Sequence, residues 1–136
     1  MDESETFFAS DSFSQELGIR LVSSSPGCAT LELDITQRHL NGHNTVHGGV
    51  IFSLADAAFG VASNNGGVDA VAINTSMTYV KAATGGVLRA VATEFSKNHK
   101  LGSYSVEVFD QDNEKIALFQ GLSYRRKPRD ASRQDK

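Results

Sequence analysis

One segment of this chain is almost entirely apolar, and it constrains the fold more than any other. It runs from Val50 to Ala62, follows the pair Gly48-Gly49, and carries a single charge, Asp56. The segment is long enough for a helix, and a helix that is apolar around most of its circumference is buried on most sides. The sequence therefore predicts a central helix that the rest of the chain surrounds.

The remainder of the chain alternates apolar and polar residues as β-strands do. We expect strands at residues 19–22, 29–35, 70–80, 86–97, 103–111 and 115–125. Short connections rich in glycine, asparagine and aspartate separate the last four, which favours antiparallel pairing. The prediction is an α+β fold with a long central helix wrapped by an antiparallel sheet of about five to six strands.

Length and composition are typical of one globular domain. The chain has 136 residues, of which 40% are hydrophobic and 21% charged. We expect a single domain over residues 1–136, with residues 1–11 and 127–136 as flexible tails. Residues 12–17 read as a short helix that Ser12 caps and Gly18 ends.

The charges exclude several classes of partner. A net charge of −3 argues against nucleic-acid binding.

The acidic start lacks the basic residues of a signal or transit peptide, and no apolar run approaches the roughly 20 residues of a membrane span. Cys28 is the only cysteine, which suits a reducing compartment. We therefore expect a cytoplasmic protein that binds neither nucleic acid nor membrane. The basic residues at 125–127 either form a solvated tail or help to bind an anionic ligand.

Asp56 is the residue that points most directly to chemistry. With Ser53, Gly60 and Ser63 it forms one stripe along the predicted helix, because these residues are spaced three or four apart. The stripe is either a helix edge that touches water, with Asp56 as a surface charge, or the wall of a cleft. The apolar neighbours favour the cleft, where the carboxylate would serve as a base or nucleophile.

The pair Gly48-Gly49 stands where the helix begins. A helix N-terminus presents unsatisfied N–H groups and partial positive charge. Glycine lets a ligand approach such a backbone closely. This end could bind a phosphate, or polarise a carbonyl group and hold the oxyanion that it becomes.

Three histidines, His39, His43 and His47, are spaced by four, which on a helix would align them for zinc. Asn41 and Gly42 interrupt the segment, and no cysteine is near. We therefore expect no metal site.

The run from Asn41 to Asp56, NGHNTVHGGVIFSLAD, resembles the signature of hotdog-fold acyl-CoA thioesterases of the phenylacetic-acid-degradation (PaaI) type. The resemblance covers residues 13–126. It implies a single hotdog thioesterase domain that hydrolyses an aromatic, phenylacetyl-type acyl-CoA to the free acid and coenzyme A. It also implies a cytoplasmic homotetramer without a cofactor, since coenzyme A is part of the substrate.

The resemblance implies roles for individual residues. Asp56 matches the catalytic carboxylate, and Gly48 matches the glycine whose N–H binds the thioester carbonyl. Asn41 and His47 match residues that line and orient the site. The remaining expected contacts to substrate are Gly49, one of Asn74, Thr75 and Ser76 as the group that places the water, and Lys97, Lys100, Arg125 and Arg126 for the phosphates of coenzyme A.

Helix geometry predicts that the site is shared between two chains. Gly48 and Asp56 are eight residues apart, which is about 12 Å of rise and about 80° of rotation on one helix. One thioester carbon fits poorly between them. An antiparallel helix from a second copy would bring Asp56 of one subunit towards Gly48 of the other. We expect a homodimer with composite sites, assembled further into a dimer of dimers.

Two alternatives remain at this point. A hotdog dehydratase acting on 3-hydroxyacyl thioesters would use His47 and Asp56 as acid–base partners. A non-catalytic acyl-CoA binding module would hold the same ligand without turnover.

Overall fold

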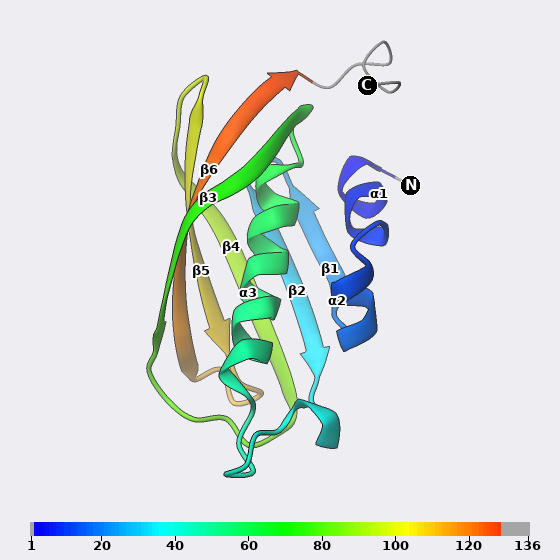
Figure 1. Cartoon of the computed structure of the whole chain (residues 1–136), viewed down its shortest axis with the longest axis vertical. Coiled ribbons are helices and arrows are strands. Elements are labelled where there is room, and N and C mark those ends of the chain that lie inside the picture. Colours follow the sequence, from blue (N-terminus) through cyan, green and yellow to red (C-terminus); the bar gives the residue numbers. More distant parts are fainter. Residues whose placement is uncertain (1, 129–136) are drawn as a thin grey trace.

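The computed structural model describes residues 2–128. One long helix packs against a curved sheet (Figure 1). The elements in chain order are α1 (Glu3–Ala9), α2 (Ser12–Leu17), β1 (Arg20–Ser25), β2 (Cys28–Asp34), the 3₁₀ turn η1 (Gln37–His39), α3 (Gly48–Ser63), β3 (Val68–Tyr79), β4 (Val87–Lys97), β5 (Leu101–Phe109) and β6 (Lys115–Pro128).

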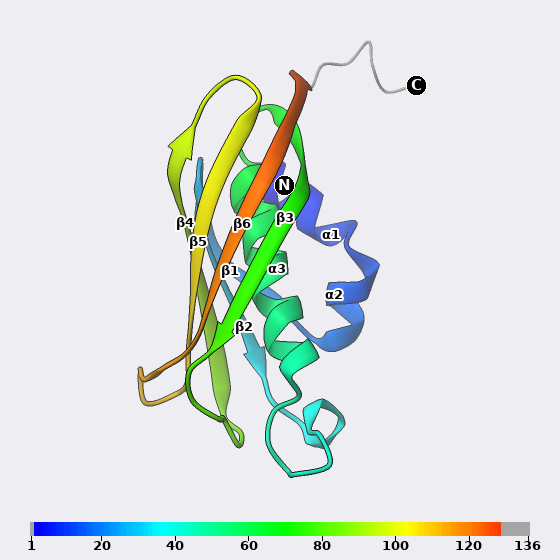
Figure 2. The ribbon, with the colours of Figure 1, turned by 60° about the vertical axis from the view of Figure 1, so that its left-hand side comes forward.

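The strands form one antiparallel sheet in the order β1-β2-β4-β5-β6-β3. The sheet curves around α3, which lies against its inner face (Figures 1 and 2). The predicted α+β arrangement is thus confirmed. The helix begins at Gly48 itself, so the glycine pair is its first turn and not a turn that precedes it.

Aromatic rings fasten α3 to the sheet. Phe59 of the helix lies with its ring centroid 5.6 Å from that of Phe119 and 5.5 Å from that of Tyr104. Gly121 makes this approach possible, since a Cβ there would come within 2.9 Å of the Phe59 ring. Side chains of Leu54, Ala58 and Val61 are fully buried beside these rings.

The N-terminal residues are ordered as helix where the sequence suggests a tail. Asp2 caps α1 by accepting a hydrogen bond from the Glu5 N–H, while Glu5 accepts one from the Asp2 N–H. Phe8 is buried, and Phe7 packs over Gly60 of α3. This reciprocal cap and the two aromatic anchors explain the helix. Figures 1 and 2 both show α1 and α2 beside α3.

Other boundaries differ in detail. α2 spans the predicted residues and ends at Gly18 with φ of 91°, but its N-cap is Asp11 and not Ser12. β1 is longer than expected because its serines pair with β2. At the C-terminal end, β6 reaches Pro128, so the predicted tail at 127–136 falls mostly outside the described residues.

β3 is an edge strand that is tied to α3 at both ends. The Tyr79 hydroxyl donates to the Gly48 carbonyl at 2.9 Å. At the far end, the Asn64 side chain donates to the Ala70 carbonyl and accepts from its N–H. β3 therefore runs back along the whole length of the helix.

No helix among residues 2–128 has the length and apolar character needed to cross a bilayer.

Candidate active site

The start of α3 is capped by the residue that precedes it. His47 occupies the N-cap, and its Nδ1 accepts a hydrogen bond from the Gly49 N–H at 2.8 Å. Its carbonyl accepts from the N–H groups of Val50 and Ile51. Because Nδ1 accepts this hydrogen bond, it carries no proton, and Nε2 is the ring nitrogen that bears one.

These bonds leave one N–H of the first turn unused. The amides of Gly49, Val50 and Ile51 all have acceptors, whereas the Gly48 N–H has none within the part of the chain that the structure describes. It sits at the positive end of a 16-residue helix. Gly48, which the resemblance assigns to binding the thioester carbonyl, is therefore the residue of this turn whose N–H is free to donate a hydrogen bond.

The two glycines differ in the room that their neighbours leave for a side chain. A Cβ on Gly49 would lie 3.0 Å from His47 Nδ1 and would push the capping ring away. A Cβ on Gly48 would lie 3.4 Å from the Tyr79 ring, an ordinary contact that would nonetheless fill the space beside the free N–H.

Asn41 shapes the loop that leads to this cap. Its side-chain oxygen accepts from the N–H groups of His43 and Thr45, and its amide donates to the Thr45 hydroxyl at 2.9 Å. The side chain is thus engaged in its own loop, with Asn44 at φ of 61° beside it. In the single chain, Asn41 organises the approach to His47.

His39 supports the same loop from inside. Its ring is buried, with Nδ1 accepting from the Thr36 N–H and Nε2 bonded to the Leu17 carbonyl, both at 2.9 Å. Its own carbonyl accepts from the His47 N–H. His43 is exposed on the loop. The three histidines therefore have separate surroundings, and no group of three or more His, Cys, Asp or Glu in the described chain is arranged to hold a metal ion.

Asp56 lies two turns along α3, on an open stripe. Its side chain is exposed in the single chain, while Ala55 and Ala57 on either side are buried. Desolvation by the surrounding protein raises the pKa of Asp56 above its ordinary value, and the negative charge of Asp11 raises it further. The stripe faces solvent in the single chain, whereas the apolar neighbours favoured the wall of a cleft. Nearby protein atoms still desolvate the carboxylate enough to raise its pKa.

The pairing of β3 with β6 separates the three candidates for the water-placing group. Thr75 pairs with Gly121 and so points to the helix side of the sheet, as Phe119 does two residues along β6. Asn74 and Ser76 pair with Leu122 and Gln120 on the opposite face. Of the three, only Thr75 faces α3.

The two contacts that tie the ends of β3 to α3 also indicate the position of Thr75 along the axis of the helix. From Tyr79 to Ala70 the strand covers about 30 Å, and from Gly48 to Asn64 the helix covers about 24 Å. Thr75 lies a little under half-way along that strand. It therefore falls level with the turn of α3 that carries Asp56.

Two of the four expected phosphate-binding cations, Lys97 and Arg125, lie beyond the other end of α3, and Lys100 is in the adjacent turn between β4 and β5. The Arg125 side chain donates to the Asn98 carbonyl, and its N–H donates to the Lys100 carbonyl. Lys97 and Arg125 both border a small recess next to Ala62 and Ser63. Arg126 follows at the point where the register of β6 with β3 shifts, and it does not border this recess.

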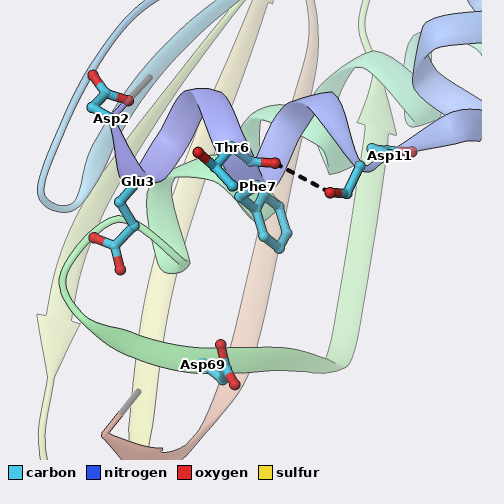
Figure 3. A pocket seen from close by; sticks show the side chains of 7 residues that line it. Asp2, Glu3, Thr6, Phe7, Asp11 and Asp69 are labelled. Carbon is cyan, nitrogen blue, oxygen red and sulfur yellow. Dashed lines mark hydrogen bonds between the residues drawn. The ribbon is translucent and has the colours of Figure 1, made fainter. Parts of the chain in front are cut away.

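A larger pocket, missed by sequence reasoning, opens between α1 and the beginning of β3 (Figure 3). Its volume is about 790 Å³. Its lining residues are Asp2, Glu3, Thr6, Phe7, Ser10, Asp11 and Asp69. The Phe7 ring, which covers Gly60 one turn beyond Asp56, links it to the Asp56 stripe. The capping pair Asp2 and Glu5 was the signal in the sequence that α1 exists.

Comparison with known proteins relates this arrangement to a family. Residues 43–117 match the model of the thioesterase superfamily. An Escherichia coli protein described as acyl-coenzyme A thioesterase PaaI is 35% identical over 119 residues, which is 87% of this chain and 85% of that one.

Solved structures agree with the sequence match. The structure of E. coli PaaI superposes with a TM-score of 0.89 at 33% identity, covering 93% of this chain and 92% of the other. A Streptococcus mutans protein bound to acetyl-CoA superposes with a TM-score of 0.78 at 25% identity, covering 82% and 91%.

Proposed function

Because the chain belongs to the thioesterase superfamily, we propose that it is an acyl-CoA thioesterase that hydrolyses its substrate to a free acid and coenzyme A. The observation that carries the proposal is the unused Gly48 N–H at the positive end of α3, on the same helix as the perturbed Asp56. A binding module would have no need of a base beside an oxyanion donor. A dehydratase would also require His47 as an acid–base partner, whereas Nδ1 of that ring is held in the helix cap.

The reaction proceeds at the carbonyl carbon. The thioester oxygen accepts a hydrogen bond from the Gly48 N–H, which stabilises the negative charge that develops there. In one route Asp56 removes a proton from water, whose oxygen attacks the carbon, and the C–S bond breaks to release the thiolate. In the other, the Asp56 carboxylate attacks the carbon, the C–S bond breaks to release the thiolate, and water then hydrolyses the resulting anhydride.

The site is composite, formed by Gly48 of one subunit and Asp56 of another. Eight residues of helix hold the two groups of one chain about 12 Å apart. The free side of β3, where Ile73 is 53% exposed, supports pairing with a second copy. Antiparallel pairing there would lay the two α3 helices side by side in opposite directions.

Thr75 places the attacking water. Its position on the helix side of β3, level with Asp56, supports this role over Asn74 and Ser76. His47 and Asn41 maintain the carbonyl-binding end through the cap and the loop. Gly49 contributes by leaving room for the His47 ring.

The acyl group is aromatic, of the phenylacetyl type. The pocket beside Phe7 supports a ring-bearing acyl group, because an aromatic side chain packs favourably against another. Asp2, Asp11 and Asp69 also line it and would repel an acyl group that carries its own carboxylate.

The phosphates of coenzyme A bind the cations beyond the C-terminal end of α3. Lys97 and Arg125 border the same recess and the Lys100 backbone lies beside Arg125, whereas Arg126 does not border the recess and contributes less.

Assembly and location complete the proposal. The dimers associate into a tetramer, for which the exposed Phe95 and Leu101 on the sheet offer apolar surface. The lone Cys28 fits a cytoplasmic protein.

A thiol-release assay tests the function. Phenylacetyl-CoA, a straight-chain acyl-CoA and a dicarboxylic acyl-CoA are each incubated with the protein, and free thiol is measured. Release fastest from phenylacetyl-CoA and slowest from the dicarboxylic substrate is expected. Hydration or dehydration of an enoyl or 3-hydroxyacyl thioester without thiol release would indicate the dehydratase instead. Tight binding without turnover of any thioester would indicate the binding module.

A further inference from the structure

One peptide group at the start of α3 is held from both sides. Its oxygen, the Gly48 carbonyl, accepts from the Tyr79 hydroxyl at 2.9 Å. Its hydrogen, on the Gly49 nitrogen, is donated to His47 Nδ1 at 2.8 Å. The side chains of Tyr79 and His47 therefore both hydrogen-bond to the peptide group that joins Gly48 to Gly49.

A clamp matters here because the backbone on either side of this peptide is glycine. Glycine samples more conformations than any other residue, so a Gly-Gly link at a helix end leaves a catalytic donor poorly fixed unless other contacts hold the backbone. The Gly48 N–H belongs to the preceding His47–Gly48 peptide, which meets the held peptide at the Gly48 Cα, so fixing the held peptide restricts the directions open to that N–H. A donor that stabilises an oxyanion is effective only when its direction is fixed in advance.

Tyr79 itself is firmly placed. It pairs with Ala117 at the end of β3, and the next two residues, Val80 and Lys81, both donate their N–H groups to the Ile116 carbonyl. A little further on, the Ala83 carbonyl accepts from the Val46 N–H, just before the cap. The hydroxyl is thus presented by backbone that is bonded to β6 and to the active-site loop.

We propose that Tyr79 is a positioning residue, whose hydroxyl holds the Gly48–Gly49 peptide so that the Gly48 N–H points at the thioester oxygen. This inference rests on the proposed function. Tyr79 acts through Gly48 and does not itself touch the reacting atoms.

The test compares Tyr79→Phe with Tyr124→Phe. Both substitutions remove one hydroxyl from a partly exposed tyrosine, but Tyr124 lies on β6 away from the start of α3. Tyr79→Phe is expected to lower kcat about tenfold with KM within about twofold. This is less than the ~10²–10³ that follows outright loss of an oxyanion-hole donor. Tyr124→Phe is expected to leave kcat unchanged.

A spectroscopic measurement separates positioning from general stability. The probe is a ketone analogue of the substrate, in which a methylene replaces the thioester sulfur and the carbonyl carbon is ¹³C-labelled. In the unchanged protein the Gly48 N–H is expected to lower the infrared stretching frequency of the bound carbonyl. Tyr79→Phe is expected to reduce that shift while the analogue still binds.

The outcomes are distinct. Unchanged kcat in Tyr79→Phe, with or without a lower melting temperature, would overturn the inference. So would a fall in kcat with an unaltered carbonyl frequency, because the hydroxyl would then act by another route. Failure of the unchanged protein to hydrolyse any acyl-CoA would remove the proposed function, and the carbonyl frequency would still report on the clamp.

Discussion

His47 and Gly49 depend on each other: the His47 ring accepts the Gly49 N–H at 2.8 Å, and a Cβ on Gly49 would lie 3.0 Å from the same ring nitrogen. The His47 ring can cap the helix only because residue 49 has no side chain. Gly49 therefore has a structural role in the cap, in addition to any role in letting a ligand approach the backbone.

This contact predicts different costs for two alanine substitutions. Gly49→Ala should displace the His47 ring and lose the cap, a change of about 1 kcal/mol in the free energy of unfolding. That corresponds to a melting temperature lower by roughly 4 °C for a domain of this size. Gly48→Ala should cost less, because its Cβ meets Tyr79 at an ordinary 3.4 Å. Thermal unfolding followed by circular dichroism measures both, and equal costs would contradict the account.

Asp56→Asn should abolish most turnover without harming the fold. Loss of a general base lowers kcat by about a hundredfold or more, while binding of the non-hydrolysable ketone analogue should persist. Steady-state kinetics and analogue titration provide the two readouts. Turnover within a few-fold of the parent would remove Asp56 from the mechanism.

The same substitution should stabilise the protein at neutral pH. The pKa of Asp56 is raised in the folded state, first by desolvation. Folding therefore favours the protonated form, and the free energy of unfolding falls as pH rises through that raised pKa. Asparagine removes this penalty, so Asp56→Asn should melt higher than the parent at pH 7 and show no gain at a pH where Asp56 is already protonated. Melting curves at the two pH values decide the matter.

Asp11 should shift the pH dependence of the reaction. Its negative charge contributes to the raised pKa of Asp56. Activity requires ionised Asp56 and should fall as pH drops through that pKa. Asp11→Asn keeps a side chain able to cap α2 but removes the charge, so the acidic limb of the kcat profile should move to lower pH. Asp112→Asn, in the turn between β5 and β6, serves as the control of equal charge change.

Mixing two inactive variants tests the composite site. Asp56→Asn and Gly48→Pro each damage every site in their own homodimers, since proline lacks the N–H. In a mixed dimer with shared sites, one site receives both lesions and the other none. Refolding the two together should restore about a quarter of the parent activity if subunits pair at random. Each variant must first be shown to fold and dimerise, and a mixture that exchanges subunits yet stays inactive would contradict sharing.

The arginines of β6 should differ in their effect on substrate affinity. Arg125 borders the recess together with Lys97, whereas Arg126 does not. Arg125→Ala should raise KM for acyl-CoA more than Arg126→Ala does, and the difference should shrink in high salt because charge attraction is screened. Equal KM values for the two variants at low salt would contradict this difference between the arginines.

The sequence was most informative where pattern and burial coincide. The apolar run with its single charge predicted α3, and the alternation after it predicted four strands, because these patterns reflect contact with one shared core. The stripe through Asp56 followed from helical spacing alone. The polar serines of β1 concealed only the second half of that strand, since pairing with β2 depends on backbone groups and not on side-chain polarity.

Contacts between segments far apart in the sequence could not be predicted from the sequence alone. Tyr79 and Gly48 are 31 positions apart and meet only because β3 runs back along α3. The choice among Asn74, Thr75 and Ser76 needed the register with β6, which a one-residue shift would reverse. α1 was overlooked because its acidic start reads as a solvated tail unless the pairing of Asp2 with Glu5 is noticed.

β3 carries both Thr75 and Tyr79, and within the described chain it pairs with β6 alone. Its other side is a row of backbone groups over a twelve-residue strand with neither proline nor lysine to discourage pairing. A lone subunit would thus expose an unpaired edge at the strand that carries Thr75 and Tyr79. Dilution below the dissociation constant of the proposed dimer would then reduce activity and solubility together, so protein concentration would determine whether a complete site exists.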